Sequence, residues 1–215
     1  MTQFSDPSQQ QLHHLATSET LRPFVLEPYS MLGCIFGVAS APEIPLPTQW
    51  LPWLFKAPVP TQYSEDVDQL ADAAMLCLQW QLKNMRDEHV EFMQGLALPA
   101  PPYKDGHLSF WLQGLLLAHS QLDSTWQKAW QAMLNTSSKD IETLHKDLKY
   151  CLGMFSTFAD IPFALQQAKS KGNDKLEQNL ATIYLSLPDT LRTYVETSGK
   201  LVEYLPNQFE TFVKD

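Results

Sequence analysis

Apolar side chains recur at three- and four-residue spacing over residues 64–95. That spacing places them on one face of an α-helix. Ser64 can cap the start of the helix, and Gly95 with the proline-containing stretch 97–102 can end it. The pattern therefore predicts one long amphipathic helix over 64–95. Its apolar face consists of Val67, Ala71, Ala74, Leu78, Leu82, Met85, His89 and Phe92.

Most of the remaining chain has the same helical character. No segment alternates apolar and polar residues in the way a half-buried strand does, and the chain contains only 8 glycines. The predicted fold is all-α, a multihelical bundle of about eight to ten helices joined by short connections. The further helices are expected at 18–25, 28–40, 48–55, 107–122, 124–134, 138–159, 162–170, 174–186 and 188–204.

The domain organisation follows from where this pattern is weak. Residues 1–16 are rich in Gln, Ser and Thr and are predicted to be a flexible N-terminal arm. Residues 17–215 are then a single all-α domain, with a subdomain seam near 97–106 as the alternative.

Two short motifs concern packing. Gly33 and Gly37 lie four residues apart in the helix expected over 28–40. They form a bare stripe on which another helix can pack closely. Residues 42–60 contain six prolines, so only a short helix fits there, with a proline at its first turn.

That short helix is unusually aromatic. Trp50, Trp53 and Phe55 lie within six residues. Such a block is typical of a core, and the alternative is a hydrophobic patch that binds a partner. These three residues are the candidate interaction surface.

Composition narrows the classes of partner and the compartment. Of 215 residues, 44% are hydrophobic and 18% charged, with a net charge of −9, which is typical of a globular chain. No Lys/Arg cluster is available for a phosphate backbone, so neither nucleic acid nor a membrane is a predicted partner. The three isolated cysteines form no disulfide framework, and the polar start has no apolar signal core. The expected location is cytoplasmic.

Searches for reactive motifs give little. The glycines are too dispersed for a phosphate-binding loop, and neither a Gly-x-Ser-x-Gly elbow nor a Cys-x-x-Cys knuckle occurs. Glu142 and His145 have the spacing of a carboxylate-bridged metal motif, but the second copy that such bundles use is missing. We therefore predict no catalytic, cofactor-binding or metal-binding residues. The pool for any site between helices is His89, His107, His119, His145 and nearby carboxylates.

Several fragments taken together resemble a known family. Residues 31–42 read MLGCIFGVASAP, residues 47–52 read PTQWLP, and residues 110–117 read FWLQGLLL, followed by Trp126. In order and spacing they resemble the YecA/YgfB-like family of small bacterial proteins, over roughly residues 20–160. The resemblance implies an all-α fold in a cytoplasmic bacterial protein, with no enzyme activity to transfer.

The chain also departs from that family. Cys34 and Leu115 stand where the family usually has Phe after Gly. The Cys-rich metal-binding segment that ends some members is lacking here, so no zinc is implied.

The sequence thus favours a non-enzymatic helical protein that acts by protein–protein interaction or in regulation. It would bind an unidentified protein partner through a hydrophobic groove between helices. A homodimer is also consistent with the apolar content, and no cofactor is expected. The alternative is a metal- or small-molecule-dependent enzyme with a site between helices.

Overall fold

The computed structural model describes residues 4, 6–87, 95–104, 106–136 and 140–206. Within these ranges the chain forms ten α-helices and two short 3-10 helices, which confirms the predicted all-α class. The only strand-like pairing among them is an isolated antiparallel bridge between Val25 and Phe55. The α-helices are α1 (Pro7–Ala16), α2 (Pro28–Ala39), α3 (Pro47–Trp50), α4 (Ser64–Arg86), α5 (His107–Gln121), α6 (Asp123–Leu134), α7 (Ile141–Ala159), α8 (Ile161–Ser170), α9 (Leu176–Tyr184) and α10 (Leu187–Val202), and the 3-10 helices are Leu51–Leu54 and Thr61–Tyr63.

Several helices begin where an acidic residue precedes a proline. Asp6, Glu27 and Asp160 accept hydrogen bonds from the first free backbone amides of α1, α2 and α8. A proline occupies the first or second position of each of these helices. Proline loses nothing there, because the early amides of a helix have no partner within it.

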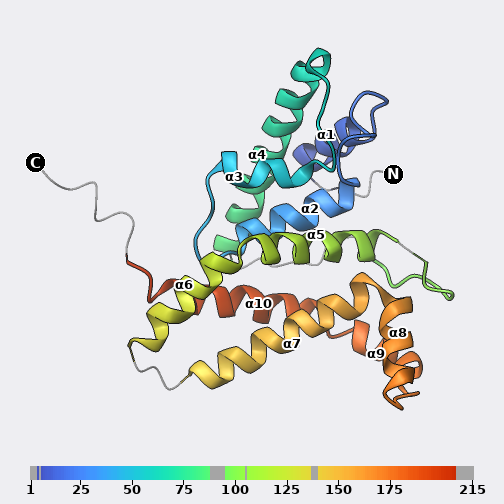
Figure 1. Cartoon of the computed structure of the whole chain (residues 1–215), viewed down its shortest axis with the longest axis vertical. Helices are drawn as coiled ribbons and strands as arrows, with labels where there is room; N and C mark the ends of the chain where they lie inside the picture. Colours follow the sequence, from blue (N-terminus) through green and yellow to red (C-terminus); the bar gives the residue numbers. More distant parts are fainter. Residues whose placement is uncertain (1–3, 5, 88–94, 105, 137–139, 207–215) are drawn as a thin grey trace, which may run out of the picture.

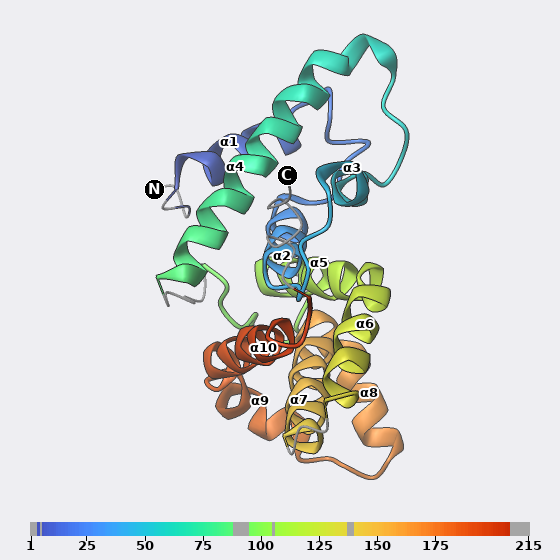
Figure 2. The ribbon, with the colours of Figure 1, turned by 90° about the vertical axis from the view of Figure 1, so that its left-hand side faces the viewer.

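Helices α2 and α5 cross at the centre of the molecule. Helices α1, α3 and α4 lie on one side of this pair and α6–α10 on the other (Figures 1 and 2). Glycines allow the crossing to be close. A Cβ added at Gly33 would lie 1.8 Å from the carbonyl oxygen of Trp111, and one added at Gly114 would lie 1.8 Å from that of Ser30. The predicted glycine stripe of α2 therefore packs directly on the backbone of α5.

The buried apolar side chains form one continuous cluster that extends from Phe4 to Leu201. Every residue of α2 is buried. Beyond α5, the side chains of Phe155 and Phe158 on α7 and of Tyr194 on α10 are fully buried. The central crossing thus joins the packing on its two sides.

Two predictions about secondary structure are wrong. The flexible arm expected over 1–16 is instead helix α1 over Pro7–Ala16, which packs on α4 and buries Leu12 completely. Its apolar residues were obscured by the polar residues around them. The helix expected over 18–25 is instead a series of turns that ends at Val25, which pairs with Phe55 in the isolated bridge.

The long predicted helix is present as α4, which ends at Arg86. Its expected continuation, including His89, lies outside the described residues. Within the described ranges, no helix is both long and apolar enough to cross a lipid bilayer.

Candidate functional site

A groove lies between α6 and α7, next to the last turn of α5. Its cavity measures about 400 Å³, within the range of ligand pockets. On α6 the lining residues Trp126, Trp130 and Leu134 follow one another at four-residue steps. The complete lining is His119, Asp123, Trp126, Gln127, Trp130, Gln131, Leu134, Ile141, His145, Leu148 and Leu152. We call this cavity the α6–α7 groove.

The α7 wall repeats at helical spacing as well, through Ile141, His145, Leu148 and Leu152. The imidazole of His145 packs against the indole of Trp130, with ring centroids 4.9 Å apart and the planes tilted by 38°. The α6 stripe from Trp126 to Leu134 is about 12 Å long, at 1.5 Å of rise per residue. The groove is therefore about two helical turns long. Its α6 wall is apolar along Trp126, Trp130 and Leu134, and its α7 wall is apolar except for His145.

One end of the groove contains a hydrogen-bonded pair of polar side chains, the half-buried His119 and the fully buried Tyr194. Nδ1 of His119 and Oη of Tyr194 share a hydrogen bond of 2.9 Å. Burial lowers the pKa of His119 to about 4, and the nearby Asp123 offsets only part of that shift. Burial also raises the pKa of Tyr194. At neutral pH both side chains are uncharged, so the pair adds no charge to the groove.

The rim of the groove is polar. Asp123, Gln127, Gln131 and His145 are exposed, whereas Trp126 and Trp130 beneath them are buried. Leu134 is an apolar exception, with 47% of its surface exposed at the end of α6. An apolar floor with a polar rim is the common arrangement of protein-binding surfaces.

The cysteines lie in the core, away from solvent. Cys34, Cys77 and Cys151 are free thiols and are buried. Burial raises the pKa to about 12 for Cys34 and Cys151 and to about 11 for Cys77. A thiol acts as a nucleophile only as the thiolate, so these side chains are unreactive at neutral pH.

The structure separates the three residues of the predicted interaction surface. Trp50 is fully buried, and a partner could not reach its side chain. The prediction that Trp50 belongs to an interaction surface is therefore wrong. Trp53 and Phe55 are half-buried and pack against the core. Leu46, which precedes this block, is 66% exposed.

The candidate histidines are distributed over two places. His119 and His145 both line the α6–α7 groove. His107 instead stacks on Tyr29, with ring centroids 3.9 Å apart and nearly parallel planes. Within the described residues, no group of three or more His, Cys, Asp or Glu side chains is arranged to hold a metal ion.

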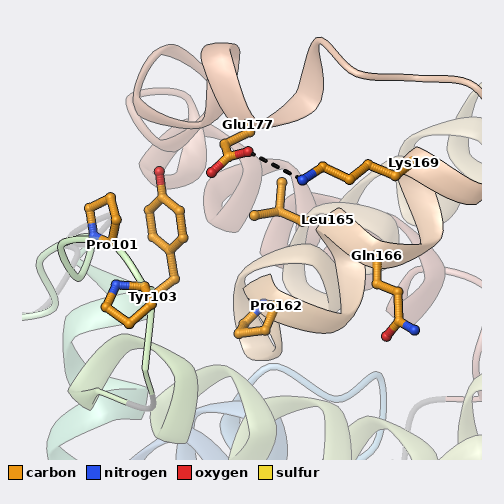
Figure 3. Close-up of a pocket in the computed structure, with 8 residues that line it drawn as sticks. Pro101, Tyr103, Pro162, Leu165, Gln166, Lys169 and Glu177 are labelled. Carbon is orange, nitrogen blue, oxygen red and sulfur yellow. Dashed lines mark ion pairs between the residues drawn. The ribbon is translucent and has the colours of Figure 1, made fainter.

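A second cavity, of about 660 Å³, lies between the loop before α5 and helices α8 and α9 (Figure 3). The ring of Tyr103 faces Leu165 across it, and an ion pair of 3.7 Å between Lys169 and Glu177 borders it. Tyr103 has a backbone φ of 56°, which is uncommon for a residue other than glycine. The walls of this cavity come from a loop and two helices, so the cavity lacks the paired helical walls of the α6–α7 groove.

Local sequence patterns could not have revealed the α6–α7 groove. The four-residue steps of Trp126, Trp130 and Leu134 are visible in the sequence, but a buried helix face gives the same pattern. His119 and Tyr194 are 75 residues apart, and no motif links them.

Comparisons with known proteins do not assign the chain to a family. No family model, no curated protein and no solved structure matches the chain. The resemblance to the YecA/YgfB-like family therefore stays a prediction.

Proposed function

We propose that the protein is a non-catalytic binding protein that holds an amphipathic helix of a protein partner in the α6–α7 groove. The observation that carries the proposal is the α6–α7 groove, whose accessible apolar lining is Leu134, Ile141 and Leu152, with the buried Trp126 and Trp130 beneath them. An apolar groove between two helices accepts side chains that repeat with the pitch of a helix, as in other helix-in-groove complexes.

The dimensions of the groove describe the helix that would bind there. Because the α6 wall from Trp126 to Leu134 is about two turns long, the groove would hold a partner helix with apolar side chains at positions i, i+4 and i+7. The exposed amides of Gln127 and Gln131 are placed to hydrogen-bond the partner's flanking polar groups. Asp123 at one end of the groove, in a chain of net charge −9, favours a basic residue at that end of the partner helix.

The protonation states of the buried groups support binding over catalysis. A general base works best when its pKa lies near the working pH. His119, with a pKa of about 4, is a weak base, and Cys151, with a pKa of about 12, is not a thiolate at neutral pH. The buried thiols also support the proposal that the protein works in a reducing cytoplasm.

The test compares two matched leucines in affinity capture from the native lysate. Leu134 lies in the groove and is 47% exposed, whereas Leu76 lies on α4 and is 48% exposed. Leu134→Lys places a charge in the apolar path, so we expect it to lose the captured partner. Leu76→Lys should retain that partner.

Both variants should keep the helical circular dichroism of the wild type, since each leucine is substantially exposed. The proposal would be contradicted if Leu134→Lys still captured the partner. It would also be contradicted if both variants lost the partner. Capture of a second copy of the chain through Leu134 would replace the proposed partner with a homodimer.

A further inference from the structure

A third cavity, of different chemistry, lies between the end of α1 and the start of α2. Here two segments are joined by backbone hydrogen bonds. The amide of Leu26 donates to the carbonyl of Leu54 at 2.9 Å, and the amide of Lys56 donates to that of Phe24 at 2.8 Å. These bonds flank the bridge between Val25 and Phe55, so the two segments hold a fixed register.

That register places the Lys56 side chain against the backbone of Arg22. The ammonium group of Lys56 donates a hydrogen bond of 3.1 Å to the backbone carbonyl of Arg22. Within the described ranges, neither side chain has a carboxylate at ion-pair distance.

Arg22 and Lys56 line the same cavity, which measures about 310 Å³. Its remaining polar lining is Thr17 and Glu27. Apolar side chains make up the rest of the wall, namely Ala16, Val25, Leu26 and Pro28. The cavity therefore combines a cationic mouth with an apolar wall.

Glu27 does not cancel the charge of this mouth. Its Oε2 atom accepts hydrogen bonds from the amides of Tyr29 and Ser30 at 2.8 and 3.3 Å. The carboxylate is thus engaged at the N-terminus of α2, where the helix dipole offsets negative charge. With two cations and one capped carboxylate, the cavity has a net positive charge.

We propose that this cavity binds a small carboxylate with a compact apolar body. The carboxylate would lie against the Arg22 guanidinium, which offers two parallel N–H donors, and the Lys56 ammonium. The apolar body would lie against Val25, Leu26 and Pro28. The volume is at the lower end for ligand pockets, which favours a body of only a few carbon atoms. This site is independent of the α6–α7 groove.

The test uses butyrate and its neutral isostere butyramide as probes on the full chain. Titration is followed through the backbone amide signals in ¹H–¹⁵N correlation spectra. Butyrate should shift the amide signals of residues 22, 24–27 and 54–57 to saturation, and butyramide should not. Arg22→Gln and Lys56→Gln should each weaken butyrate binding roughly tenfold or more, as expected for loss of a hydrogen bond to a charged group.

Lys200→Gln is the matched control, because Lys200 is an exposed cation of α10 outside the cavity. It should bind butyrate like the wild type. Unchanged thermal melting of Arg22→Gln and Lys56→Gln would show that the fold is intact. The proposal would be overturned if butyramide gave the same amide shifts as butyrate, or if Arg22→Gln bound butyrate as tightly as the wild type. It would also be overturned if the shifts caused by butyrate did not saturate and were spread over surface lysines.

Discussion

The close crossing of α2 and α5 makes Gly33→Ala a demanding test of the fold. The added Cβ would lie 1.8 Å from the carbonyl oxygen of Trp111 and 2.7 Å from its carbonyl carbon. Both atoms belong to the backbone of α5 and cannot rotate away as a side chain can. A carbon–oxygen contact of this kind is normally about 3.3 Å or longer, so the two helices would have to separate by about 1.5 Å.

The energetic consequence can be bounded. Inserting a methyl group into a well-packed interior costs about 1–3 kcal/mol, and a clash with main chain belongs at the upper end of that range. Alanine returns about 1 kcal/mol through its higher helix propensity. We therefore expect Gly33→Ala to lower the free energy of unfolding by about 2 kcal/mol or more, a large part of the roughly 5–15 kcal/mol typical of a domain.

Gly153 provides the matched control. It lies inside α7, and a Cβ added there would meet nothing within 4 Å. Gly153→Ala should therefore raise the free energy of unfolding by about 0.5–1 kcal/mol. Urea unfolding followed by circular dichroism at neutral pH would measure both variants. The reasoning would be refuted if the two variants had the same stability within about 0.5 kcal/mol.

Two further predictions concern the groove and the aromatic block. Burial lowers the pKa of His119 to about 4 in the folded protein, so between that value and about 6.5 the unfolded chain binds more protons and stability falls as the pH is lowered. The free energy of unfolding, measured with urea, should therefore fall less in His119→Asn than in the wild type when the pH is lowered from 7 to 4.5. An equal fall in both proteins would contradict the burial of His119. Trp50→Ala should lose about 3–5 kcal/mol in urea unfolding, whereas Leu46→Ala should change stability by no more than about 0.5 kcal/mol; a Trp50→Ala protein as stable as wild type would return that residue to the surface.

The sequence predicted local structure well where a physical signal was local. The helices expected to begin at residues 28 and 162 begin at Pro28 and Ile161, and the spacing of Gly33 and Gly37 marked a close contact. What the spacing could not supply was the partner of that contact. Gly114 lies far along the chain, and only the fold brings its backbone against Ser30.

The errors have equally specific causes. Helix α1 was missed because its buried face is narrow, with Leu12 and Leu15 set among glutamines and histidines. Trp50 and Trp53 have the same side chain three residues apart, yet one is fully buried and the other half-buried. Composition cannot distinguish them, because burial depends on which side of a short helix faces the core.

The most direct test of the proposed function is site-specific photo-crosslinking from the rim of the groove. A benzophenone side chain at Gln131, an exposed groove residue on α6, is compared with one at Gln79, an exposed residue on α4. We predict that Gln131 gives a discrete adduct with a partner, that the crosslinked peptide has apolar residues at helical spacing, and that Leu134→Lys abolishes the adduct. An adduct of equal yield from Gln79, or one from Gln131 that survives Leu134→Lys, would contradict binding in the α6–α7 groove.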